Sequence, residues 1–515
     1  MHFKVLIALI GVASGIVLGE LYLYGSELSM AVSFLGLLQL ALYFLERYFD
    51  KKNGHSDLPK HFSIPLLSGI FCITVAIGIV RVQFIEEKNN FLCKDVCSFV
   101  ATITTYPQVK GAYQILQVAP VTDERVYNVQ VKVPLYPVYK KGESIVLSGK
   151  VTEPHAYMEH SGVKPFNYRE YLRVHGVGSE MLYPKVELLR DDRTDSFFTH
   201  VLPQVREHFL ATIARYVNEP SASLATGMLF GNDSMSKELT TTFRTAGLSH
   251  IVVLSGFNIA ILISFVLFIL KVVPLFLRVS AAAVFVLLFV MMVGAEASIV
   301  RATLMASIGL IAMVIGRAYV ARQALLLSLL LIILYEPLHL LYDVSLHLSF
   351  LATAGIVYAG NEIEKLIKHF RSSLFVEIMT TTFAAYIATL PYVMYTFGTV
   401  SLYALFTNLI VLPVVPLMML STFMIIVVAP LSGILGTVFG YVTTMLGTYV
   451  IFVAKVVEGL PLSSLPSSLS LWMMYTLYVG MIFFLYICSV QKNKYAKNET
   501  TVTKSDEILS GVIRY

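Results

Sequence analysis

Long apolar segments separated by short polar ones dominate the chain, and they predict membrane-spanning helices. A helix needs roughly 20 mostly apolar residues to cross the hydrocarbon core of a bilayer, and about twelve segments meet this requirement. They lie near residues 4–24, 27–46, 64–82, 250–270, 279–294, 298–316, 322–335, 344–360, 376–397, 401–429, 432–457 and 470–489. The pattern therefore predicts a polytopic α-helical membrane protein.

Two of these segments need comment. Residues 4–24 lack a small-residue cleavage site and lead directly into a second apolar segment, so we expect a retained helix rather than a signal peptide. Pro413 and Pro416 interrupt the segment 401–429. Because proline breaks a helix, this segment is predicted to be a broken helix or a re-entrant pair.

A different pattern occupies residues 83–195. VYNVQVKV at 126–133 and IVLSGKV at 145–151 alternate in the period-two manner of strands, with Pro and Gly between them. This predicts a small β-barrel or sandwich inserted after the third helix. Residues 196–247 then show amphipathic helical patterns, which we expect to lie along the membrane surface.

Composition and charge extend this prediction. The chain is 56% hydrophobic and 14% charged, which is typical of an integral membrane protein. Basic residues gather in the loop 47–64, which predicts a cytoplasmic loop and hence a cytoplasmic N-terminus. Residues 83–220 would then be extracytoplasmic, residues 248–489 would form the main transmembrane domain, and the polar tail 490–515 would be cytoplasmic. We expect the protein in the cytoplasmic membrane.

Cys93 and Cys97 lie four apart in the segment predicted to face an oxidising compartment. The spacing leaves a disulfide and two independent thiols equally open. A lone CxxxC does not predict a metal site, and the histidines lack the spacing of a recognised ligand set. We therefore expect no metal and no cofactor.

The segment GLSHIVVLSGFNIAILI at 247–263 carries unexpected polar residues in an apolar run. On a straight helix His250, Ser255 and Asn258 span an arc of about 140°, which makes one broad polar side. His250 and Ser255 diverge too far to act as base and nucleophile, and the chain has neither a GxSxG nor an HExxH motif. This favours a protein that is not an enzyme.

Other ionisable or amide groups fall in predicted spans. Such groups cost roughly 2.5–3.5 kcal/mol each to insert and usually face a protein interior or a water-filled path. Arg301 is either a helix-end residue, part of an interhelical ion pair, or a substrate contact, and Glu296 lies too far around the helix to pair well with it. Asp343 and His347 share one helix side, as a functional pair or as an N-cap Asp joined to a His. Asn408 favours a hydrogen bond between helices.

Several blocks of sequence occur in a characteristic order. They are ATGMLFGNDSMSKELTTTFRTAGLSHIVVLSGFNIAIL at 225–262, GAEASIVRATLM, GRAYVARQ, EPLHLLYDVSLHLSFLATAGIVY and LPYVMYTFGTVSLYALFTNLIVLPVVP. This series resembles the competence domain of ComEC-family DNA-internalisation proteins. YKKGESIVLSGKV and PFNYREYLRVHGV resemble the N-terminal OB-like domain of that family.

The resemblance implies a channel that passes one DNA strand across the cytoplasmic membrane during natural transformation. It places Gly231, His250, Ser255, Gly256, Arg301, Ser349 and Asn408 on matching motif positions. Together with the polar residues noted above, the candidates for the translocation path are His250, Ser255, Asn258, Glu296, Arg301, Asp343, His347 and Asn408, with motif glycines Gly231, Gly247, Gly256 and Gly294. Many relatives have a second His where this chain has Asn258. Many also end in a metallo-β-lactamase-like domain, which this sequence lacks, so we expect the nuclease to be a separate protein.

The OB-like resemblance implies that aromatic and basic side chains bind the single strand. Lys and Arg equal Asp and Glu in number over 83–200, so any basic groove is local. Tyr106, Tyr113 and Tyr136 are further stacking candidates. The predicted DNA contacts are Tyr127, Lys132, Tyr139, Lys140, Lys141, Lys150, Arg169 and Arg173.

Two other functions remain open from the sequence. The balanced charge of the predicted barrel and the departure at Asn258 favour a transporter or exporter of another polymer or solute, and the polar residues of the spans suggest a membrane hydrolase. The chain has no GxxxxGK[ST] motif for ATP binding. A cytoplasmic helicase or translocase is therefore an expected partner. The other expected partners are single-stranded DNA, membrane lipids, a DNA receptor, a separate nuclease, and further copies of the chain as a homo-oligomer.

Overall fold

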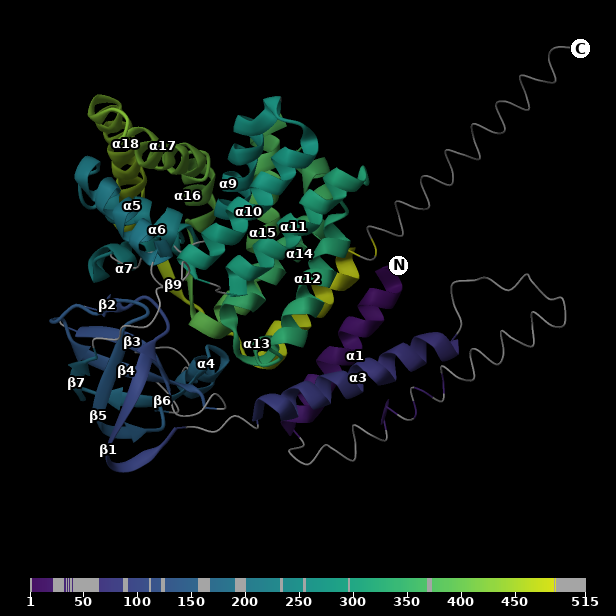
Figure 1. Cartoon of the computed structure of the whole chain (residues 1–515). Coiled ribbons are helices and arrows are strands. Elements are labelled where there is room, and N and C mark those ends of the chain that lie inside the picture. Colours follow the sequence, from purple (N-terminus) through teal and green to yellow (C-terminus); the bar gives the residue numbers. More distant parts are fainter. Residues whose placement is uncertain are drawn as a thin grey trace, which may run out of the picture.

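Figure 1 shows the computed structural model, in which a β-barrel lies beside a larger assembly of helices. The first helix, α1 (His2–Leu21), crosses α3 (Ile64–Glu86). The structure describes residues 2–21, 32–33, 35, 37, 39, 64–86, 91–110, 113–121, 126–155, 167–189, 201–231, 235–252, 256–294, 297–367, 373–485 and 487. The predicted span 27–46 and the tail 490–515 fall largely or wholly outside these residues.

The barrel confirms the prediction of a small β domain with OB-like topology. Its elements are β1 (Cys93–Ile103), β2 (Gln108–Lys110), β3 (Tyr113–Pro120), β4 (Asn128–Pro134), β5 (Ser144–Thr152), α4 (Tyr168–Val174), β6 (Val177–Leu182) and β7 (Lys185–Leu188). Neighbouring strands follow the order β1-β3-β4-β6-β5, and β5 pairs with β1 to close the barrel. The pairing of β4 with β6 is parallel, whereas the other pairs are antiparallel.

The period-two pattern explains the barrel core. On β3, Gln114, Leu116 and Val118 are buried, while Tyr113 and Gln117, which alternate with them, are only partly buried. The same alternation buries Val129, Val131 and Val133 on β4. Because successive side chains of a strand point to opposite faces, the buried set fills the barrel and the intermediate set forms its outer face.

Four helices connect the barrel to the rest of the chain: α5 (Leu202–Tyr216), α6 (Ser221–Phe230), α7 (Lys237–Thr245) and α8 (Ser249–Val252). Helices are present here as predicted, whereas their expected position along the membrane surface stays a prediction. All residues of α6 are buried within the protein. Its sequence SASLATGMLF is small or apolar on every side, and a helix of this kind belongs in an interior.

The remaining elements form the helical assembly. They are α9 (Gly256–Ile269), η2 (Leu270–Val272), α10 (Leu275–Val293), α11 (Ala297–Ile315), α12 (Ala321–Tyr335), α13 (His339–Tyr342), α14 (Val344–Ile367), α15 (Ser373–Phe397), β8 (Thr399–Ser401), α16 (Ala404–Val411), α17 (Val415–Val428), α18 (Gly433–Glu458) and β9 (Ser464–Pro466). One large core joins α5 to α11 with α16 to α18. Arg81 of α3 donates to the carbonyl oxygens of Leu334 and Tyr335, at 2.7 and 2.5 Å, and thereby holds the N-terminal helix pair to α12.

Among the described residues, three helical segments are both long and apolar enough to cross a membrane: Leu66–Gln83, Leu275–Val293 and Gly433–Glu458. A fourth span results if α16 and α17 count together. These two helices meet at a 45° bend, which confirms the predicted break near Pro413 and Pro416. Shorter apolar helices include Gly256–Val272, Ile299–Ile315 and Ala321–Tyr335. The count of about twelve spans therefore stays a prediction.

Candidate functional site

Arg301 of α11 is a cation buried within the helical assembly, with 7% of its surface exposed. Its Nη1 donates to the Ser349 carbonyl oxygen at 3.1 Å and to Thr353 Oγ1 at 2.5 Å, both on α14. The guanidinium carbon lies 5.6 Å from the centre of the Phe350 ring. Nε has no hydrogen-bond partner, and no carboxylate of the described residues lies within ion-pair distance.

These contacts bear on the predicted roles of Arg301. Because Arg301 is buried, it does not have the role of a helix-end side chain that reaches to lipid headgroups. It also forms no interhelical ion pair within the described part of the chain. Glu296 lies outside that part. A buried guanidinium with donor capacity to spare remains available to an anion.

Two motif glycines permit close contacts around this region. A side chain at Gly256 would place its Cβ 2.9 Å from Nη2 of Arg301, which requires one of the two groups to move. Gly247 has φ +75° and follows α7, where the Gly247 and Leu248 amides donate to the Arg244 and Phe243 carbonyl oxygens in a Schellman motif. A Cβ at Gly247 would lie 2.3 Å from the Ala404 Cβ on α16, so no other residue fits here without a shift of the backbone.

Two of the polar residues around the start of α9, His250 and Asn258, differ in their exposure. Asn258 is 2% exposed, and its Nδ2 donates to the Met228 carbonyl oxygen of α6 at 2.9 Å. His250 on α8 is exposed. Ser255 lies outside the described residues. The predicted broad polar side stays a prediction, because residues 253–255, between α8 and α9, lie outside the described residues.

Asp343 is the N-cap of α14, as one of the two alternatives predicted. Its Oδ1 accepts from the amides of Ser345 and Leu346 at 2.8 and 3.1 Å. The paired histidine is His339, whose Nδ1 lies 2.8 Å from Asp343 Oδ2, so the expected pair with His347 is wrong. The side chain of His347 instead contacts Tyr392 Oη at 2.6 Å and the Leu340 carbonyl oxygen at 2.7 Å.

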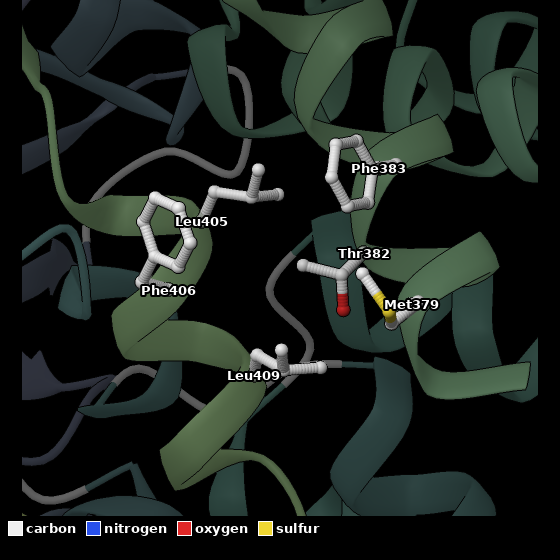
Figure 2. Close-up of a pocket in the computed structure, with 6 residues that line it drawn as sticks. All are labelled: Met379, Thr382, Phe383, Leu405, Phe406 and Leu409. Carbon is white, nitrogen blue, oxygen red and sulfur yellow. The ribbon is translucent and has the colours of Figure 1, made fainter. Parts of the chain in front are cut away.

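Asn408 on α16 is 7% exposed, and its Oδ1 has no hydrogen-bond partner among the described residues. The predicted bridge between helices therefore stays a prediction. Nearby, α15 and α16 line a small, partly open apolar pocket of about 30 Å³ (Figure 2). Ligand pockets are roughly 300–1,000 Å³, so this pocket is too small for a nucleotide. Its lining residues are Met379, Thr382, Phe383, Leu405, Phe406 and Leu409.

On the barrel, two predicted stacking residues are buried. Tyr127 and Tyr139 are each 5% exposed, so they cannot present a ring to a base, and this part of the prediction is wrong. Burial raises the pKa of both phenols. Tyr136 is 75% exposed and keeps the predicted accessibility.

The outer face of β3 and β4 holds a cation between rings. Lys132 Nζ lies 3.8 Å from the centre of the Tyr113 ring and 5.6 Å from that of Tyr183, which is 57% exposed. The second and third strands of an OB-fold barrel, here β3 and β4, present the face that binds oligonucleotides. Tyr183 was not predicted, because it follows β6 in sequence and joins this face only through the parallel β4–β6 pairing.

The other predicted basic contacts divide by their partners. Lys140 pairs with Glu207 at 3.4 Å, and Arg169 pairs with Glu153 at 3.0 Å. Arg173 lies 3.4 Å from Glu170 and 3.9 Å from Glu20 of α1, so it joins the barrel to the helical assembly. Lys150 is exposed, and Lys132 and Lys141 have no ion pair within the described part of the chain.

Cys93 and Cys97 are separate thiols in the structure. Cys93 Sγ lies 3.2 Å from the Asp95 carbonyl oxygen, whereas Cys97 Sγ lies 3.6 Å from that of Gly149. Burial, together with the neighbouring Cys93, raises the pKa of the Cys97 thiol to about 11. Of the two alternatives from sequence, the structure shows the unbonded one. No group of three or more potential metal ligands occurs among the described residues.

Comparison with known proteins gives two matches. A family model described as Competence protein matches residues 228–491. ComE operon protein 3 of Bacillus subtilis (strain 168) is 24% identical over 327 residues, which cover 61% of this chain and 40% of that relative. No solved structure matches the chain.

Proposed function

Because this chain belongs to the Competence protein family, we propose that it carries single-stranded DNA across the cytoplasmic membrane as a channel component in natural transformation. The observation that carries the proposal is Arg301. It lies inside the family match, is buried, and has no carboxylate partner in the described part of the chain. A guanidinium binds phosphate through its planar fork, so a passing DNA backbone can supply the missing anion.

The barrel supports the choice of DNA as the substrate. It has the strand order of an OB-fold, and its β3–β4 face carries Tyr113, Lys132 and Tyr183 together. OB-folds bind single strands by stacking bases on aromatic rings and by placing cations along the backbone. The same chain thus combines a single-strand-binding type of surface with an apolar helical assembly. We propose no catalytic role for it.

We further propose that the chain crosses the membrane many times, with both termini in the cytoplasm and residues 83–220 outside.

This topology can be tested in a chain whose four cysteines are replaced by Ser. A cysteine at the exposed barrel position, Lys150→Cys, is expected to react with a membrane-impermeant maleimide in intact cells. Lys365→Cys lies in the last turn of α14, between the predicted spans 344–360 and 376–397, where the proposed topology places the chain in the cytoplasm, and it should react only after permeabilisation. Equal protection of both positions in intact cells would contradict this topology.

The proposed partners follow from what transport requires. The sequence has no P-loop motif, so a cytoplasmic helicase or translocase would supply directional force, and a DNA receptor would deliver the strand. Whether the chain works as a monomer or a homo-oligomer can be read from cross-linking in native membranes.

The proposed function predicts the effect of deleting the gene. Cells that lack this protein should still bind fluorescently labelled double-stranded DNA at the surface but should accumulate none in a DNase-resistant cytoplasmic pool. Transformation frequency should fall to the background of spontaneous mutation, and a plasmid copy should restore it. Unchanged cytoplasmic uptake in the deletion strain would refute the proposal.

A further inference from the structure

Three residues meet where the barrel contacts α5. Tyr106 lies in the connection between β1 and β2, Lys141 lies in the turn between β4 and β5, and Arg206 lies on α5. The guanidinium carbon of Arg206 is 4.1 Å from the centre of the Tyr106 ring, and Lys141 Nζ is 4.9 Å from it. Lys140, in the same turn as Lys141, pairs with Glu207 of α5, and Figure 1 shows this side of the barrel facing the helices. Two cations therefore share one aromatic ring at this junction.

Among the described residues, the junction has an excess of positive charge: Lys140, Lys141 and Arg206 lie near one carboxylate, Glu207, whose charge also acts on Arg206. Arg206 is 8% exposed, and within the described part of the chain neither its Nε nor Tyr106 Oη has a hydrogen-bond partner. The adjacent carboxylate, Glu207, pairs with Lys140 at 3.4 Å, and both of those side chains are at least half exposed. Burial lowers the pKa of Lys141, and the nearby Arg206 lowers it further. An anion bound here would relieve the repulsion and satisfy the unpaired donors.

We propose that Tyr106, Lys141 and Arg206 form a phosphate-binding site that holds a backbone phosphate of the single strand as it passes from the barrel to the helices. The proposal rests on the proposed function. The donors suit a phosphodiester, since guanidinium, ammonium and phenol are all hydrogen-bond donors and two of them are cationic. The ring is covered by cations, so the site would hold the backbone rather than a base.

The position of Tyr106 favours DNA over other phosphates. It lies in the connection between the first and second strands of the closed barrel, β1 and β3, and in OB-folds this loop borders the nucleic-acid face. Sequence reasoning missed Arg206, although helical spacing places it on the same side of α5 as Leu202 and Ile213, which are also buried. A lone cation in such an apolar stripe was the available signal.

The test measures binding of fluorescein-labelled oligothymidylate to the purified full chain in phosphatidylcholine nanodiscs across a range of NaCl concentrations. Each phosphate contact contributes about 0.7 to the slope of log affinity against log salt for single strands. Lys141→Gln should lower the magnitude of that slope by about 0.7. Tyr106→Phe keeps the ring and removes only the unpaired hydroxyl, and it should weaken binding about threefold to tenfold at constant slope. Arg206→Lys keeps the positive charge but loses the planar guanidinium donors, and it should weaken binding by a similar factor.

The matched control is Lys185→Gln on β7, because Lys185 already pairs with Glu187 at 3.0 Å and its loss should leave the slope unchanged. Wild-type affinity and slope in Lys141→Gln and Tyr106→Phe would overturn the site. Loss of oligothymidylate binding when phosphatidylglycerol replaces phosphatidylcholine would also overturn it, in favour of a lipid headgroup. The binding measurement is separate from transport. If the wild-type chain does not import DNA, the proposed function is refuted. If the variants bind oligothymidylate as wild type does while the wild-type chain imports DNA normally, only the site is refuted.

Discussion

An Arg301→Met variant is expected to reach the membrane in normal amounts and yet import DNA at least about 100-fold less well than wild type, a difference of about 2.7 kcal/mol in the barrier. Methionine fills the volume of the buried side chain and removes the charge. If the guanidinium meets DNA phosphates, its loss raises the cost of moving an anion through an apolar interior. The measurement is the amount of DNase-resistant labelled DNA per cell, normalised to the protein level in membrane immunoblots.

Two further variants separate charge from architecture. Arg301→Lys keeps a cation that can still donate to Ser349 and Thr353, but it loses the remaining guanidinium N–H groups that would bind a phosphate, so import should be intermediate. Arg317→Met removes an exposed arginine that follows α11, and it should import DNA as well as wild type does. If Arg301→Met imported at the wild-type level, Arg301 would be a structural brace between α11 and α14.

Local patterns carried most of the fold prediction. Period-two alternation predicted the barrel, and the two prolines predicted the break between α16 and α17. The OB-like strand order is a long-range property, and it came from the resemblance rather than from periodicity. The burial of Tyr127 had no such local signal. It precedes β4, lies outside the barrel core and interacts with Arg173 of α4, so its ring is covered by tertiary packing and cannot stack on a base.

The candidate site was predicted in its residue types but not in its pairings. Asp343 and His347 are four apart, but that spacing brings side chains together only within one helix. Asp343 lies between α13 and α14, where its side chain caps α14 and contacts His339. Arg301 meets Ser349 and Thr353 through the packing of α11 against α14, 48 residues or more apart in sequence. Such contacts depend on tertiary packing, which no local pattern encodes.

The buried position of α6 had a signal in a distant helix. A glycine stripe on α18 faces it and the end of α5: Gly436 and Gly440 lie against Tyr216, and Gly447 lies against Ser221. Small residues on one helix face allow backbones to approach closely, as they do between packed membrane helices. The stripe therefore fixes α5 and α6 to the helical assembly, and through α5 it also fixes the barrel.

This contact predicts that Gly440→Ala lowers the free energy of unfolding by about 2–3 kcal/mol and that Gly440→Leu prevents accumulation of folded protein. A Cβ at Gly440 would overlap the Tyr216 carbonyl oxygen and lie 2.9 Å from the Tyr216 Cβ, so α18 and α5 must separate.

Gly433→Ala is the matched control on the same helix, because its Cβ would lie 3.7 Å from Tyr216 Oη, an ordinary contact. Alanine also favours helix over glycine by up to about 1 kcal/mol, so this control should be neutral or stabilising. The measurement is the temperature at which detergent-solubilised protein leaves its monodisperse size-exclusion peak. Equal temperatures for Gly440→Ala and Gly433→Ala would show that the two helices do not depend on close backbone contact.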